Sequence, residues 1–200
     1  MFTGIVAATG KITHVEALEK GLRLTIHAPK LDLADVGLGD SIAHNGVCLT
    51  VIEKSGDSYK VDVSKESLDC TVGLDGRGSA EVNLEKAMQL TDRLGGHLVS
   101  GHVDGVGEVV KFDKIGESHE LVIRAPADLA KYIARKGSVT VNGVSLTTNR
   151  VDGAEFSINL IPHTVLVTTL KHLHAGAKVN LEVDLIARYC ERLLSFDTPA

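Results

Sequence analysis

Apolar and polar side chains alternate along much of this chain, as they do in strands that bury one face. The alternation is clearest in residues 22–26, 59–63, 121–123 and 156–160. Glycine and aspartate separate such segments at intervals of roughly 8–12 residues, a spacing typical of all-β domains. The pattern therefore predicts a mostly β structure, built as a small barrel or a sandwich of short strands.

Helical patterns inside the chain are few and short. Pro126 precedes apolar residues at 129, 132 and 133, which predicts a helix that begins at the proline. The matching stretch after Pro29 predicts a weaker helix, because glycines interrupt it at 37 and 39. Ser64 is expected to cap a short turn that runs to residue 70, and Pro162 to begin the matching turn in the second half.

The last helical pattern is stronger and runs from 184 to 196. Apolar residues fall at 186, 189, 190, 193 and 194, which form one stripe of an amphipathic helix. Asp184 is placed to cap it. A lone terminal helix has to bury such a stripe, either on its own barrel or against copies of itself in an oligomer.

The chain also contains an internal tandem repeat, whose two copies align with a spacing of 97 residues. Gly4 aligns with Gly101, and Pro29 aligns with Pro126. The segments 45–47 and 142–144 are both Asn-Gly-Val, and 82–85 and 179–182 are both Val-Asn-Leu-Glu. Two copies predict two similar folded units, with two similar ligand pockets on one chain. The boundary falls in the glycine-rich segment 95–102.

Composition narrows the classes of function. The 200 residues carry a net charge of −5 and no basic stripe, which argues against nucleic acid as a partner. Three cysteines without metal spacing argue against a disulfide framework and a metal site. The first residues lack the features of a signal peptide, and no apolar run reaches transmembrane length. We expect a soluble protein in the reducing cytoplasm.

The two copies differ at positions that bear on chemistry. The second copy replaces Ile5, Gly39 and Ala87 of the first by His102, Lys136 and Asp184, which are groups for proton transfer and anion binding. Cys48 becomes Ser145. Three further changes lie in the aligned segments 62–67 and 159–164: Asp62 becomes Asn159, Lys65 becomes Pro162 and Glu66 becomes His163.

Each of these features also has a purely structural interpretation. The shared Asn-Gly blocks could be hairpin turns that both units need for folding. His97 and His102 could be solvated or packed linker histidines, and Lys136 could be a surface charge. Asp184 could serve only as a helix cap, and a lone Cys48 on a turn can be inert.

The combined motifs strongly resemble the riboflavin synthase family. They are MFTGIV (1–6), HNGVCLT (44–50), GGHLVSGH (95–102), NGVSLT (142–147), NLIPHT (159–164) and VNLEVD (179–184), and the resemblance covers essentially the whole chain. It implies two tandem six-stranded Greek-key β-barrels and a C-terminal helix. The implied divisions are 1–97 and 98–185 for the two lumazine-binding barrels, and 186–200 for a helix and tail through which three chains associate.

The resemblance also implies a reaction. A transferase of this family converts two molecules of 6,7-dimethyl-8-ribityllumazine into riboflavin and 5-amino-6-ribitylaminouracil, the last step of riboflavin biosynthesis. It uses no cofactor and no metal. Two substrate molecules meet between the N-terminal barrel of one subunit and the C-terminal barrel of its neighbour. An association with lumazine synthase is left open.

The family's mechanistic candidates match Ser41, Cys48, His97, His102, Ser145 and Asp184. We hypothesise that Cys48 lines the acceptor-side pocket and that Ser145 assists at the other with Asp184. Which residue is the general base stays undecided at this stage. The implied substrate-binding residues are Phe2, Gly4, Ile5, Val6, Cys48, Leu49, Thr50, Asp62, Val63, Ser64, Lys65, Glu66, Ser67, Gly101, His102, Val103, Lys136, Ser145, Leu146, Thr147, Asn159, Leu160, Ile161, Pro162, His163 and Thr164.

Two other readings compete with a synthase. A non-catalytic lumazine- or flavin-binding protein of the same fold should lack polar residues at one of its two sites, whereas both Asn-Gly blocks keep them here. A flavin-dependent reductase barrel should carry a nicotinamide-binding domain, for which this chain has no residues left.

Overall fold

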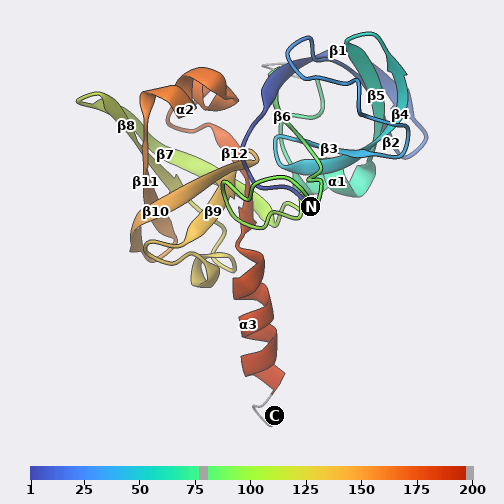
Figure 1. The fold of residues 1–200 in the computed structure, drawn as a ribbon. Helices are drawn as coiled ribbons and strands as arrows, with labels where there is room; N and C mark the ends of the chain where they lie inside the picture. The colour runs from blue at the N-terminus through green and yellow to red at the C-terminus, as the bar shows by residue number, and fades with distance from the viewer. Residues whose placement is uncertain (77–80, 197–200) are drawn as a thin grey trace.

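The computed structural model describes residues 1–76 and 81–196. Two closed antiparallel barrels stand side by side, and a C-terminal helix extends away from them (Figure 1). The strand order is β1-β2-β5-β4-β3-β6 in the first barrel and β7-β8-β11-β10-β9-β12 in the second, so both copies of the repeat have one topology. The predicted all-β fold of two six-stranded barrels and a terminal helix is confirmed.

The first barrel consists of β1 (Ala8–Leu18), β2 (Gly21–His27), β3 (Ser41–His44), β4 (Val47–Ser55), β5 (Ser58–Ser64) and β6 (Glu81–Lys86). The second consists of β7 (Gly105–Ile115), β8 (Ser118–Arg124), β9 (Ser138–Val141), β10 (Val144–Asp152), β11 (Glu155–Leu160) and β12 (Lys178–Val183).

Alternation places one face of each strand inside its barrel. Leu24 and Val61 are fully buried in the first core, as are Leu121 and Ile123 in the second. Pairing registers shift in β1 and β4, and again at the equivalent places in β7 and β10. Such bulges bend strands, so the repeated positions indicate that both barrels close by the same means.

The short helices only partly match expectation. α1 (Lys65–Cys70) begins after Ser64, whose side chain accepts from the Ser67 N–H, and α2 (Pro162–Val167) begins at its proline, as predicted. The helix predicted from Pro126 was wrong in extent: only a 3₁₀ turn, η1 (Ala130–Tyr132), forms there. Burial of Leu129 and Ile133 in the barrel core explains their apolar spacing without a longer helix.

The weaker helix predicted after Pro29 was wrong. Residues 28–40 form turns between β2 and β3, and Gly39 has a positive φ of 92°. A second 3₁₀ turn, η2 (Thr169–His172), precedes β12. Its Lys171 and His172 contact Glu81 of the first barrel.

A buried amide network joins the barrels. The Asn83 side-chain N–H₂ donates to the Asn142 carbonyl at 2.9 Å, and the Asn180 side-chain N–H₂ donates to the Asn45 carbonyl at 3.0 Å. Asn45 and Asn142 both lie in the left-handed region, with φ of 47° and 48°. The predicted Asn-Gly turns are therefore confirmed, and they have a second role as the contact between the two barrels.

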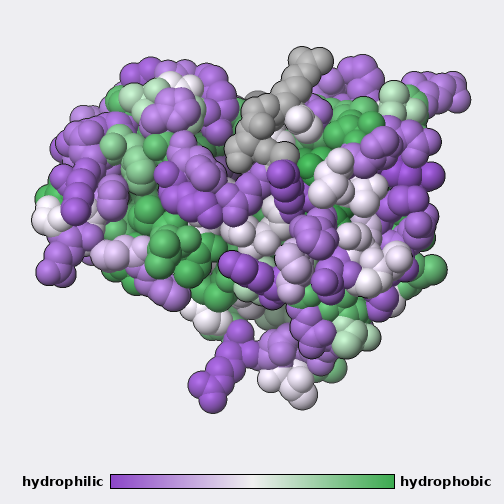
Figure 2. Space-filling model, turned by 90° about the horizontal axis from the view of Figure 1, so that it is seen from above, coloured by the Kyte–Doolittle hydropathy of each residue, from purple (hydrophilic) through white to green (hydrophobic). Residues whose placement is uncertain are grey.

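The terminal helix α3 (Leu185–Phe196) is confirmed, while residues 197–200 of the predicted helix and tail lie outside the described residues. Glu191 binds Lys131 and Tyr132 on the second barrel, whereas the apolar stripe stays exposed, with Leu193 at 69%. The end of the molecule opposite α3 is covered mainly by hydrophilic side chains (Figure 2). No helix within the described residues is long and apolar enough to cross a membrane.

Candidate functional site

The segments that precede the two barrels are exchanged between them. The Gly4 carbonyl accepts from the Ser145 N–H at 2.7 Å, and Val6 packs against the core of the second barrel. The Gly101 carbonyl accepts from the Cys48 N–H at 2.8 Å, and Val103 packs against the core of the first. Each pocket region therefore combines residues from both copies, which the repeat did not predict.

Glycine is required where these segments touch the opposite barrel. Gly4 has a φ of 76°, and a Cβ there would lie 2.6 Å from the Ser145 Cβ. Gly101 has a φ of 80°, and its Cβ would lie 2.7 Å from the Cys48 Cβ. Both the backbone conformation and the close approach exclude larger residues, which explains the identical glycines in the two copies.

A polar pair between the linker residue His97 and Ser145 of β10 lies where the exchanged segment meets the second barrel. The ring atom Nδ1 of His97 lies 2.7 Å from Ser145 Oγ. The backbone N–H of His97 donates to the Thr3 carbonyl at 3.1 Å. His97 is only 8% exposed. Burial lowers the pKa of His97, and the Asp184 carboxylate opposes this by favouring the imidazolium. A neutral imidazole that is hydrogen-bonded to a hydroxyl in this way can accept the hydroxyl proton.

The Nε2 atom of His97 has no hydrogen-bond partner among the described residues. If Nδ1 accepts from Ser145, Nε2 carries the ring proton. Asp184 directly follows β12, and its Oδ1 accepts from the Ile186 N–H at 3.0 Å. Asp184 therefore caps α3, as the sequence predicted, and also acts on the charge of His97.

The equivalent place on the first barrel is more apolar. Cys48 is half-buried and pairs with Ala43 across β3 and β4, next to Phe2, which is fully buried. Ser41 pairs with Thr50 one step along the same outer face. Among the described residues, no hydrogen bond joins the His102 ring to the Cys48 thiol; instead the His102 N–H donates to Ser100 Oγ at 3.3 Å.

Lys136 has an unusual backbone. Its φ is 65°, in the region where the aligned Gly39 also lies. The Lys136 N–H donates to the Thr148 carbonyl, matching the bond from Gly39 to Val51. A lysine in this conformation costs about 1–3 kcal/mol. The fold thus demands the turn in both barrels, and only the second places a cation on it.

The remaining predicted binding residues divide by orientation. The side chains of Leu49, Val63, Leu146 and Leu160 point into the barrel cores, so only their backbone groups can meet a ligand. Thr50, Thr147, Ser64, Asn159, Ile161, Pro162 and His163 are exposed. Other polar members already have protein partners, because Asp62 binds Arg23 and Lys65 binds Asp69. Glu66 lies in the first turn of α1, Ser67 completes its cap, and Thr164 accepts from Thr168 through its carbonyl.

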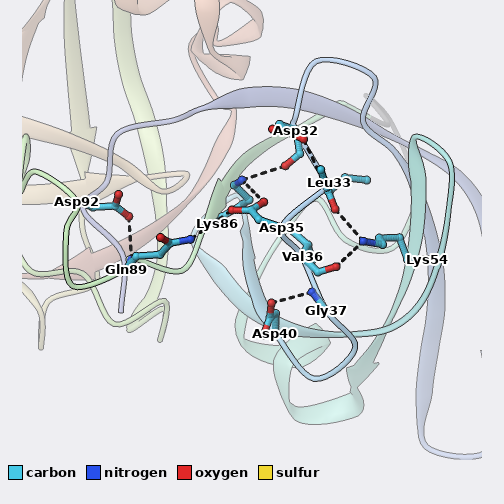
Figure 3. A network of polar contacts seen from close by, with 11 residues as sticks. Asp32, Leu33, Asp35, Val36, Gly37, Asp40, Lys54, Lys86, Gln89 and Asp92 are labelled. Atoms are coloured by element: carbon cyan, nitrogen blue, oxygen red, sulfur yellow. Dashed lines mark hydrogen bonds and ion pairs between the residues drawn. The ribbon is translucent and has the colours of Figure 1, made fainter.

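Two lysines donate hydrogen bonds to the loop that leads to Ser41 (Figure 3). Lys86 Nζ donates to the Asp35 carboxylate at 2.6 Å, and this lowers the pKa of Asp35. Lys54 Nζ donates to the Leu33 and Val36 carbonyls. A cleft of about 580 Å³ opens beside this loop, with Ile5 on its wall. Among residues 1–76 and 81–196, no cluster of His, Cys, Asp or Glu could hold a metal ion.

Comparison with known proteins agrees with this double architecture. The lumazine binding domain model matches residues 3–87 and again 100–184. The riboflavin synthase of Photobacterium phosphoreum is 49% identical over 199 residues, covering 100% of this chain and 91% of its own. The chain belongs to the riboflavin synthase family. Members from Mycobacterium tuberculosis H37Rv and Bacillus subtilis are 47% and 41% identical, each over 97% of this chain and over 98% and 90% of their own.

Solved structures related to the family show which ligands such a fold holds. The crystal structure of LumP complexed with 6,7-dimethyl-8-(1'-D-ribityl) lumazine matches with a TM-score of 0.81 at 28% identity. LumP complexed with riboflavin matches with a TM-score of 0.82 at 29% identity. Each match covers 92% of this chain and 99% of the LumP chain.

Proposed function

We propose that this chain is a riboflavin synthase, a transferase that converts two 6,7-dimethyl-8-ribityllumazine molecules into riboflavin and 5-amino-6-ribitylaminouracil. A four-carbon unit passes from one lumazine to the other, so the two products contain all atoms of the two substrates. The observation that carries this proposal is the full-length similarity to curated riboflavin synthases, 41–49% identical. The part-buried His97–Ser145 pair supports the proposal, because a neutral imidazole beside a hydroxyl can accept a proton.

The His97–Ser145 pair is the proposed site of proton abstraction. The lumazine 7-methyl group is acidic, because the ring system delocalises the electron pair left when a C–H bond breaks. Ser145 Oγ takes that proton as its own hydroxyl proton moves to His97 Nδ1. Asp184 stabilises the resulting imidazolium, whose formation it already favours in the free protein. This extends the hypothesis that Ser145 assists at this pocket with Asp184, by adding His97 as the group that accepts the proton.

The first barrel is the proposed acceptor side. Cys48 lies at the position equivalent to Ser145 and provides a thiol for addition to the second ring. The exposed hydroxyls of Thr50, Thr147 and Ser64 suit the polyhydroxylated ribityl chain. Two pockets with one architecture and different polar groups fit a reaction in which identical molecules play different roles. Holding both in reacting geometry then supplies much of the rate enhancement.

The proposed active form is a homotrimer in the cytoplasm. One edge of α3 is bound to its own barrel through Glu191, and the exposed Ile186, Tyr189 and Leu193 form a stripe suited to other copies of α3. Docking between subunits would bring the first barrel of one chain to the second barrel of its neighbour. The divisions that we propose are 1–97, 98–185 and 186–200.

The second candidate is a protein that binds lumazine or flavin without converting them, favoured by the structural match to the LumP complexes. Comparing the wild type with Ser145→Ala decides between them. A synthase should lose about 10²- to 10⁴-fold in riboflavin formation with Ser145→Ala, while lumazine binding, read by fluorescence titration, persists. A wild type that binds lumazine with unchanged fluorescence and forms no riboflavin would support the second candidate.

A further inference from the structure

Two buried carboxylates hold the exchanged segments in place. Glu85, at the end of β6, is 8% exposed. Its Oε1 accepts from the Thr3 N–H and from Thr3 Oγ1, both at 2.7 Å, and its Oε2 accepts from the Gly4 N–H at 2.9 Å. Three bonds to one short segment fix both its position and its direction.

The second copy repeats this arrangement. Glu182, near the end of β12, is 2% exposed. Its Oε1 accepts from the Ser100 N–H at 2.7 Å and from Ser100 Oγ at 2.6 Å, and its Oε2 accepts from the Gly101 N–H at 3.0 Å. Burial raises the pKa of both carboxyls, and the hydrogen bonds oppose that rise. Buried carboxylates are costly unless such bonds compensate, so their occurrence in both copies calls for a specific role.

Each carboxylate is connected, through the segment that it holds, to a candidate site residue on the other barrel. Gly4, held by Glu85, accepts from the Ser145 N–H, and Thr3, also held by Glu85, accepts from the His97 N–H. Glu85 belongs to the first barrel, yet its segment supports Ser145 on the second barrel and the linker residue His97 that pairs with it.

The reverse holds for Glu182. Gly101, which it holds, accepts from the Cys48 N–H. Glu182 belongs to the second barrel, and its segment supports the thiol position on the first. The two contacts are related by the 97-residue repeat, but they serve pockets with different side chains.

We propose that Glu85 and Glu182 are positioning residues that act crosswise, Glu85 for the His97–Ser145 pair and Glu182 for Cys48. The catalytic meaning of this arrangement rests on the proposed function, whereas the crosswise coupling itself is a property of the fold. Substitution of either carboxylate should therefore affect the candidate site residue on the other barrel more than the one on its own barrel.

Amide hydrogen exchange in the substrate-free protein tests the coupling directly. The measurement compares the Ser145 and Cys48 amides in wild type, Glu85→Gln and Glu182→Gln. Glutamine keeps the size but replaces one accepting oxygen by an N–H₂ group that faces donors. Glu85→Gln should speed exchange at Ser145 about tenfold and leave Cys48 near its wild-type rate, and Glu182→Gln should do the reverse. Equal effects at both amides, or a larger effect within the mutated barrel, would overturn the proposal.

Milder variants cover the case in which a glutamine variant does not fold. Thr3→Val and Ser100→Ala each remove the hydroxyl bond to the carboxylate, together with the bond that the hydroxyl accepts from the backbone N–H two residues later. Both variants leave the carboxylate with its two backbone donors. The same crosswise pattern is expected with smaller factors, and its absence would contradict the proposal. Because exchange is read without substrate, failure of the coupling is separable from failure of the synthase reaction.

Alkylation gives a second readout, which loss of stability alone would not produce. The rate at which iodoacetamide labels Cys48, measured by mass spectrometry, should change in Glu182→Gln and stay at the wild-type value in Glu85→Gln. The exposed Cys70 and Cys190 serve as internal references in each sample. A Cys48 rate that responds equally to both variants would contradict the crosswise assignment.

Discussion

The core of the first barrel holds a buried polar pair that the second barrel replaces by apolar residues, and this difference predicts a pH dependence of stability. His44 is fully buried in the first barrel, with Nε2 2.7 Å from the hydroxyl of Tyr59. The second barrel has Val141 and Phe156 at the equivalent positions. Burial lowers the pKa of His44 to about 4, so the folded core holds it neutral.

The sign and size of the effect follow from that pKa. The unfolded chain binds a proton at His44 below about pH 6.5, whereas the folded chain does so only near pH 4. The stabilising contribution of the neutral core is therefore complete above pH 6.5 and is lost as the pH falls towards 4. A pKa lowered by about 2.5 corresponds to a loss of about 3 kcal/mol, of which about 2.5 kcal/mol falls between pH 7.5 and 4.5.

The perturbation is the double change His44→Val and Tyr59→Phe, which gives the first core the residues of the second. Urea unfolding at pH 7.5 and 4.5, at one protein concentration, measures the free energy of unfolding of both proteins. The wild type should lose about 2.5 kcal/mol more than the double variant between these pH values. Identical losses would refute the reasoning, because other titrating groups are common to both proteins.

The remaining predictions concern the site and the assembly. Lys136→Gly should raise the free energy of unfolding by about 1 kcal/mol, because relief of the positive φ, about 1–3 kcal/mol, outweighs the unfolded-state entropy that glycine adds, about 0.5–1 kcal/mol, and it should weaken lumazine binding. Gly39→Lys should destabilise the protein, and the opposite sign in thermal unfolding would contradict the strain argument. Asp184→Asn removes the carboxylate that raises the pKa of His97, so the acid limb of the pH–rate profile should move to lower pH; an upward move would exclude this role. Leu193→Asp should dissociate the oligomer in sedimentation experiments, and an unchanged sedimentation coefficient would contradict assembly through α3.

The mostly β fold could be predicted because four strand segments carry an alternating pattern, whereas the two six-stranded barrels came from the family resemblance. The alternation in 22–26 and 59–63 reports a buried face directly, and the 97-residue repeat transfers the assignment to the second barrel. The failures came from short apolar runs. Leu129 and Ile133 have helical spacing, yet they are spaced to reach a barrel core from a 3₁₀ turn, and pattern alone does not separate these cases.

The candidate residues could be named, but their grouping could not. The repeat aligns Gly4 with Gly101 but does not indicate that each contacts the opposite barrel. A contact with the residue's own barrel and a contact with the opposite barrel would give the same alignment. His97 lies just before the aligned part of the second copy, so the alignment did not suggest its pairing with Ser145. The identical Glu85 and Glu182 were visible in the repeat, and their burial was what the sequence did not show.

Incubating the wild-type protein with 6,7-dimethyl-8-ribityllumazine alone and quantifying every product tests the proposed synthase activity. A synthase should form one riboflavin and one 5-amino-6-ribitylaminouracil for each two lumazines consumed, with no added metal or cofactor. Lumazine that is bound, keeps its fluorescence and yields no riboflavin would contradict the proposed synthase activity.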